Sequence, residues 1–237
     1  MRFAIKSSNN NSIGSLLNRK ADLIKNIFIL LLVQIIITGL VAHFTISKKK
    51  PAKSSSSPRP SAAKIALAVL IFIAIIAILW IMIGIIMDPS RNPILRISLF
   101  TIISVFMGMG LSYVKTLPAR VVAMATIGTI TAFFVMAGIG YYAASKGIDL
   151  SPMGIWLFGA LIIMMVVSLV LYIAYPKDPL VRRIITTIFV VIFSLYIMYE
   201  TNEILRGQMD YIEGSFSYYI DIINIFKDLL YLFSDDN

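Results

Sequence analysis

Repeated apolar runs, each long enough to cross a lipid bilayer, constrain this chain more than any other feature of its sequence. A transmembrane helix needs about 20 consecutive, mostly apolar residues, because only a helix or a closed barrel satisfies its own backbone in lipid. The chain has 237 residues, of which 59% are hydrophobic and 14% charged. We therefore predict an all-α integral membrane protein. Its seven expected spans are residues 27–46, 65–87, 94–114, 120–144, 154–175, 180–206 and 215–233.

These spans are expected to form one transmembrane domain, residues 27–237, preceded by a basic N-terminal tail, residues 1–26. The tail lacks the short apolar segment and small-residue cleavage site of a cleaved signal peptide. A basic loop rich in Ser and Pro, residues 47–64, is predicted to be flexible because this composition cannot form a packed core. The last span is short and polar for 30 Å of hydrocarbon, so it is either a full crossing or a re-entrant hairpin.

Charge and composition restrict the classes of function. The chain has no cysteine, which excludes disulfides, thiol catalysis and cysteine metal sites. The single histidine, His43, ends the first apolar run, where an interfacial position is expected. The net charge is +9, and basic segments outside membrane spans favour anionic lipid headgroups over nucleic acid as partners. The tail holds five Lys or Arg and the 47–64 loop six, so the positive-inside rule does not fix the orientation.

Two acidic residues near the end of the chain are the main candidates for a functional site. Carboxylates at membrane depth are rare and usually functional. If the sixth helix ends at Arg206 with Gly207 as a left-handed cap, Glu200 lies about two turns from that end. If the next helix starts near Gly214, Asp221 lies about two turns inside it. Antiparallel packing would then bring Glu200 and Asp221 to a similar depth, where they could share a proton.

A polar stripe follows one face of the last span. Ser217, Asp221, Asn224 and Asp228 are spaced i, i+4, i+7 and i+11 among Ile, Leu, Phe and Tyr. We interpret the stripe as facing the interior of a helix bundle and lining a path. The alternative is that Asp228 lies at the water interface and that Asp221 is a satisfied structural group.

Small residues recur in the third and fourth spans, at Gly108, Gly110, Gly128, Gly138 and Gly140. Helices in lipid associate through close packing of such residues. We therefore expect these glycines to be helix–helix contacts.

The sequence resembles the transmembrane Bax inhibitor motif family, which includes the Lifeguard proteins and bacterial calcium-leak homologues. The main matches are FSLYIMYETNEI (193–204) and DYIEGSFSYYIDIINIF (210–226). RKADLIKNIFILLLVQIIITGLVAHF (19–44) is similar to the Lifeguard first helix, and SVFMGMGLSYV (104–114) to the family's third helix. The number and order of the spans also agree.

The resemblance implies a bundle of six helices around a central seventh. It also implies that Glu200 and Asp221 gate a calcium leak in response to pH. Family members usually have Asp where this chain has Glu200, which places the set-point of the sensor in question. Bacterial members have an arginine after the second helix that can engage the pair, and Arg91 and Arg96 are the two candidates for it here. The alternative is that both arginines are simply solvated at the membrane surface.

The chemistry of such a pair is simple. Two carboxylates a few ångströms apart in a low dielectric cannot both stay ionised cheaply, so they titrate as a unit. Protonated, they can hydrogen-bond and hold two helices together. Deprotonated, they repel and can bind a hard cation such as calcium between them. No other cofactor is expected. Ser217 and Asn224 would add neutral oxygen ligands along the path.

Other classes of function have less support in the sequence than a calcium leak, or are compatible with it. An enzyme is not expected, because the chain has no Cys, no HExxH, no GxSxG and neither the YD nor the GxGD signature of intramembrane aspartyl proteases. A non-conducting adaptor that suppresses cell death through contacts with other membrane proteins is the alternative, and a proton-coupled carrier is a third reading. The membrane is expected to be that of the endoplasmic reticulum, Golgi or mitochondrion in a eukaryote and the plasma membrane in a bacterium.

Overall fold

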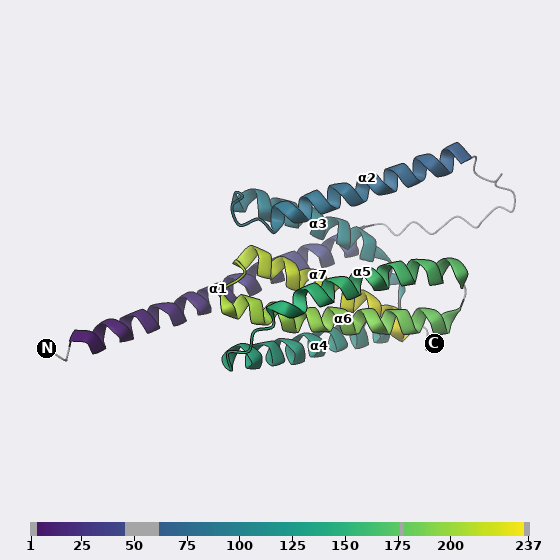
Figure 1. Ribbon diagram of the computed structural model, residues 1–237. Helices are drawn as coiled ribbons and strands as arrows, with labels where there is room; N and C mark the ends of the chain where they lie inside the picture. Colours follow the sequence, from purple (N-terminus) through teal and green to yellow (C-terminus); the bar gives the residue numbers. More distant parts are fainter. Residues whose placement is uncertain (1–3, 46–61, 176–177, 235–237) are drawn as a thin grey trace.

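The computed structural model describes residues 4–45, 62–175 and 178–234, and within them the chain is helical and contains no strand. Figure 1 shows the helices arranged as one elongated bundle. The elements are α1 (Ala4–Phe44), α2 (Ala62–Ile86), α3 (Pro93–Gly110), the 3-10 helix η1 (Leu111–Thr116), α4 (Ala119–Ser145), α5 (Ser151–Ala174), α6 (Pro179–Arg206) and α7 (Tyr211–Ser234). The predicted all-α membrane fold is confirmed.

The helix α7 is the centre of the bundle. It packs against α1, α2, α3, α4 and α6, whereas α5 packs mainly against α6 on the outside. Its side chains Ile212, Phe216, Tyr219 and Ile225 are buried within one apolar core that includes Ile27. The polar stripe does not prevent this burial, because Ser217 and Asp221 face Glu200 of α6, whereas Asn224 and Asp228 have partners within α7 itself.

The outside of the bundle is apolar, as lipid requires. Five helical segments are long and apolar enough to cross a membrane: Lys20–Phe44, Pro93–Thr116, Ala119–Ser145, Ser151–Tyr172 and Pro179–Arg206. Large apolar side chains such as Trp156 on α5 and Phe134 on α4 are more than half exposed. Among the described residues, α7 is not in this group because of its polar stripe, although it is a continuous helix of 24 residues. Its continuity excludes the re-entrant hairpin.

The helix ends follow local chemistry. Asn92 and Asp178 accept hydrogen bonds from the first turns of α3 and α6, and each is followed by a proline at the first helical position. α6 ends at Arg206, and Gly207 adopts φ 79° as its left-handed cap, as expected from the sequence. This cap fixes the depth of Glu200.

Every α-helix begins before its expected first residue, and the starts of α1 and α7 differ most. α1 begins at Ala4, so the backbone of the polar segment before residue 27 continues the helix and projects beyond the other helices in Figure 1. α7 begins at Tyr211, three residues before Gly214, because Asp210 and Glu213 form a capping box. Asp210 Oδ1 accepts the N–H groups of Ile212 and Glu213 at 2.8 and 2.9 Å, and Glu213 Oε2 accepts the N–H of Asp210 at 2.8 Å.

Three of the five glycines are close helix contacts. A Cβ on Gly108 would lie 2.6 Å from the Thr38 carbonyl oxygen of α1, and one on Gly128 would lie 2.9 Å from the Leu229 side chain of α7. Gly140 meets the α6 backbone at Met198 in the same way. Gly110 and Gly138 face open space, so the prediction of packing contacts is wrong for these two.

Candidate functional site

The carboxyl groups of Glu200 and Asp221 lie side by side in the protein interior. Glu200 is on α6, six residues before its end at Arg206, and Asp221 is on α7. Their exposed fractions are 7% and 3%. The two groups are within hydrogen-bonding distance of each other, and Ser217, one turn before Asp221, is within hydrogen-bonding distance of Glu200.

The pair is incompletely satisfied. Glu200 Oε2 and Asp221 Oδ2 are buried, and neither has a hydrogen-bond partner among the residues that the structure describes. An ionised carboxylate only accepts hydrogen bonds, so two carboxylates cannot satisfy each other unless one carries a proton. Leaving such a group unpaired in a low dielectric is costly. The arrangement therefore suits a shared proton or a cation placed between the oxygens.

Aromatic side chains surround the pair. The Tyr218 hydroxyl lies 2.6 Å from the Thr201 hydroxyl, and the Tyr218 ring packs edge-on against Phe133 at 5.1 Å between centroids. Tyr196 is close enough to interact electrostatically with both carboxyl groups. Within the described part of the chain, no arginine or lysine contributes to the environment of either acid.

The rest of the polar stripe lies further along α7 and has other partners. Asn224 donates to the Ile220 carbonyl at 2.9 Å and accepts from Lys227 at 3.1 Å. The Asp228 side chain is 13% exposed and lies 3.8 Å from the Lys227 ammonium group. Of the three flanking positions predicted from the stripe, only Ser217 joins the pair.

The two candidate arginines are engaged elsewhere. Arg91 is exposed and pairs with Asp88 in the same turn at 3.1 Å. Arg96 is 2% exposed; its guanidinium binds both oxygens of Asp210 at 2.5 and 3.1 Å, and its Nε donates to the Ile86 carbonyl at 2.8 Å. Arg96 thus ties the end of α2 and the start of α3 to the first turn of α7, away from the carboxyl pair.

A second buried polar cluster on the opposite side of α7 was not anticipated. The Tyr219 hydroxyl lies 2.6 Å from the Thr38 hydroxyl of α1, which also contacts the carbonyls of Gln34 and Ser104. Gln34 Nε2 donates to the Thr101 hydroxyl at 3.1 Å. Gln34 and Thr38 stand four residues apart inside an apolar run, and that spacing of polar groups is the signal that could have identified them.

The loop between α4 and α5 is attached to α6 through residues that sequence reasoning also missed. The Asn202 side chain donates to Ile148 and accepts from the N–H of Leu150, at 3.0 and 3.1 Å. Ser151 donates to Glu203 at 2.6 Å. These bonds fix the segment of α6 that immediately follows Glu200.

The site offers limited ligation for a metal. No cluster of three or more His, Cys, Asp or Glu side chains that could hold a metal ion occurs in residues 4–45, 62–175 and 178–234. Calcium takes six to eight oxygen ligands, and two carboxyls with the Ser217 hydroxyl supply only part of that set. The donor chemistry fits a hard cation in transit that keeps some of its water.

Comparisons with known proteins agree with this architecture. Residues 20–237 match the family described as "Inhibitor of apoptosis-promoting Bax1". The chain is 32% identical over 148 residues to Protein LIFEGUARD 4 of Arabidopsis thaliana, covering 61% of this chain and 59% of that protein. It is 32% identical over 151 residues to Protein LIFEGUARD 1 of the same plant, covering 62% and 63%. An uncharacterised protein of Campylobacter jejuni is 34% identical over 120 residues, covering 49% and 50%. These alignments span between half and two thirds of the relatives' own length.

Proposed function

The chain belongs to the Bax inhibitor family, and on that premise we propose that it is a calcium-leak protein whose path is gated by the protonation of Glu200 and Asp221. It would act in calcium homeostasis and the inhibition of apoptosis, without catalysing a reaction. One observation carries the proposal: the buried carboxyl groups of Glu200 and Asp221, on the neighbouring helices α6 and α7, lie within hydrogen-bonding distance of each other, and one oxygen of each lacks a donor among the described residues.

The pair can act as a latch between two helices. With one shared proton, the carboxyl groups hydrogen-bond and join α6 to the central α7. Without it, two like charges repel at close range in a low dielectric, where their interaction is strong. The separated oxygens then offer a site to a hard, divalent cation. Calcium and the proton would therefore compete for the same two groups.

Two exposed acids, Asp149 and Asp88, are poor alternatives as the sensor. Asp149 in the α4–α5 loop is exposed, and the nearby Ser151 hydroxyl together with the hydrogen bond from the Ser151 N–H lowers its pKa below the usual 3.8. Hydrogen bonds from Ser90 likewise lower the pKa of Asp88. Both stay ionised between about pH 5 and 8. A change in calcium flux between about pH 5 and 8 must therefore arise from groups other than Asp149 and Asp88.

Calcium flux from liposomes that contain only the purified protein tests the proposal. Glu200→Gln and Asp221→Asn should each flatten the dependence of flux on pH. Glu203→Gln is the matched control, because Glu203 is also buried on α6 but binds Ser151 instead of the pair. If both variants keep the wild-type flux and pH profile, the latch is wrong. If wild-type liposomes do not leak calcium at all, the conducting role itself fails.

The adaptor hypothesis makes the opposite prediction. It requires partner proteins that bind the basic loop, residues 47–64, or the basic tail, residues 1–26. Most of the loop lies outside the described residues. An adaptor should co-purify with a partner only when the loop is present, and it should not leak calcium alone. The host membrane, whether of an organelle or of a bacterium, would follow from localisation of a tagged chain.

A further inference from the structure

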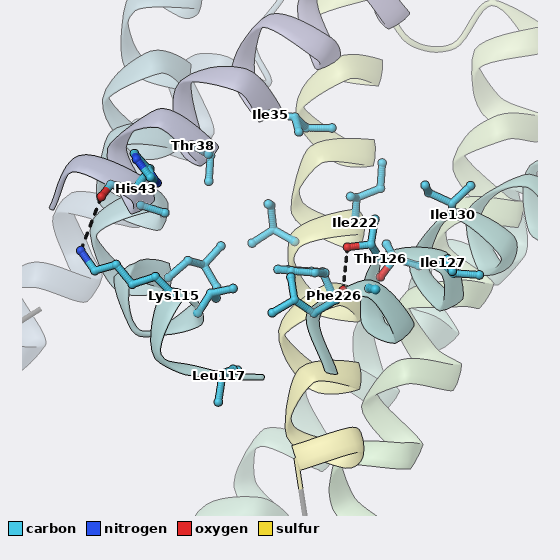
Figure 2. A pocket seen from close by; sticks show the side chains of 18 of the residues that line it. Ile35, Thr38, His43, Lys115, Leu117, Thr126, Ile127, Ile130, Ile222 and Phe226 are labelled. Carbon is cyan, nitrogen blue, oxygen red and sulfur yellow. Dashed lines mark hydrogen bonds between the residues drawn. The ribbon is translucent and has the colours of Figure 1, made fainter. Parts of the chain in front are cut away.

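A large cavity lies apart from the carboxyl pair, and neither Glu200 nor Asp221 lines it. It measures about 980 Å³ and lies between α1, η1, α4 and α7. Figure 2 shows Lys115 and His43 on one side, Ile127 and Ile130 on the other, and Phe226 between them. The volume is at the upper end of the roughly 300–1,000 Å³ of small-molecule sites.

The walls of the cavity call for an apolar occupant. The hydroxyls among its lining residues are already satisfied: Thr126 and Thr129 bind carbonyls of their own helix at 2.8 Å, and Thr38 binds Tyr219. Ile127 and Ile130 on the rim are 65% and 51% exposed, on a helix long and apolar enough to cross the membrane. The cavity therefore opens sideways toward lipid.

The depth of the cavity corresponds to one leaflet. Its lining on α4 runs from Ala119, at the start of the helix, to Ile130. Eleven residues of helix rise by about 16 Å, close to half of the roughly 30 Å hydrocarbon thickness of a bilayer. An acyl chain that entered the cavity from one membrane surface would fill it.

The end of the cavity at the start of α4 is basic. Lys115 donates to the carbonyls of His43 and Thr45 and so uses two of its three N–H groups on described residues, which leaves one for a ligand. The first turn of α4 has no side-chain cap, so its helix dipole also favours negative charge there. A phosphate placed beside Lys115 would accept a hydrogen bond from its ammonium group and would also lie at the positive end of the α4 dipole.

We propose that this cavity binds one acyl chain of an anionic membrane phospholipid, with the lipid phosphate held at Lys115 and the start of α4. The bound chain would pack against Ile222, Ile223 and Phe226 of α7. The inference concerns binding alone and stands whether or not the protein conducts calcium.

Native mass spectrometry of the protein released from lipid nanodiscs tests the proposal. Nanodiscs of phosphatidylcholine are compared with and without phosphatidylglycerol. The wild type should retain phosphatidylglycerol selectively. Lys115→Gln should weaken that retention about fivefold, the effect of one basic residue on anionic lipid, and Lys115→Arg should preserve it. Lys146→Gln, at the other end of α4, is the control for a general loss of charge.

A steric pair of variants covers the case in which Lys115→Gln fails to fold. Ala123→Trp fills the cavity, whereas Met124→Trp places the same bulk on the neighbouring, 39% exposed position, which does not line it. Retention should be lost in the first and kept in the second. The proposal would be overturned if both variants retained phosphatidylglycerol equally, or if the wild type retained phosphatidylcholine as well as phosphatidylglycerol. It would also be overturned if the protein were released as a dimer that Ala123→Trp dissociates, because a second copy of the chain would then cover the cavity.

Discussion

At the scale of the single residue, Gly140 sets how closely α4 approaches α6. A Cβ added there would lie 2.8 Å from the Thr201 Cβ and closer still to the Met198 carbonyl oxygen, so α6 would have to move beside Glu200. Gly140→Ala should destabilise the protein by about 1–3 kcal/mol, the usual effect of overpacking. Thermal unfolding in detergent measures it.

Gly138 supplies the matched control two residues earlier on the same helix. A Cβ there meets nothing within 4 Å. Because alanine favours helix over glycine by about 1 kcal/mol, Gly138→Ala should leave the stability unchanged or raise it. Equal losses in the two variants would show that the close approach of α4 to α6 does not limit packing at Gly140.

At the scale of the element, the first turn of α7 depends on Asp210 in two ways. Asp210 caps the helix and also pairs with the buried Arg96. Asp210→Asn keeps a good capping side chain but leaves the Arg96 charge uncompensated, which should cost about 2–4 kcal/mol of unfolding free energy. Asp210→Ala should cost about 1 kcal/mol more, because the cap is lost as well.

Asp88→Asn is the control for this pair, because Asp88 binds Arg91 at the exposed α2–α3 turn. Exposed ion pairs contribute little to stability, so the thermal midpoint should barely move. A loss in Asp88→Asn as large as that in Asp210→Asn would mean that the burial of Arg96 is irrelevant.

The same region shows how far the sequence specifies the fold. The lengths of the apolar runs and the Gly207 cap were enough to place the helices and the depth of Glu200, because these signals are local. The start of α7 was placed too late at Gly214, although Asp210 and Glu213 have the spacing of a capping box. The pairing of Arg96 with Asp210 spans 114 residues and was not predictable, since only packing of α3 against α7 brings them together.

The depth of Glu200 and Asp221 was predictable, whereas their surroundings were not. Helix geometry put both acids near the same level, and the polar stripe indicated the face of α7. Which stripe residues join the pair depends on competition for partners. Asn224 bonds to a carbonyl of its own helix and to Lys227. Of the stripe residues, only Ser217 and Asp221 therefore lie beside Glu200.

At the scale of the whole molecule, the two ends of the bundle are held differently. At one end, the Arg96–Asp210 pair and the bonds of Asn202 and Glu203 join the α2–α3, α4–α5 and α6–α7 connections to the bundle. At the other end, α1, η1 and the start of α4 surround the large cavity. Regions with few buried contacts open locally at lower free energy than the core.

One contact at the first of these ends, between Asp149 and Arg206, should persist over the pH range of the proposed sensor. The pKa of Asp149, which pairs with Arg206 at 3.0 Å, is lowered in the folded state. Its contribution to stability is therefore present above the unfolded value near 3.8 and is lost only as the pH falls through the lower, folded value. Between about pH 5 and 8 this contact should not change.

Hydrogen–deuterium exchange in nanodiscs can distinguish the two ends. Amides of η1 and of the first turn of α4 should exchange faster than those at the end of α6 and the start of α7. The comparison is made at pH 7, where Asp149 is ionised and its contact with Arg206 is intact. Faster exchange at the α6–α7 connection would place the weak end of the bundle beside Asp210 and would contradict the role assigned to the Arg96 pair.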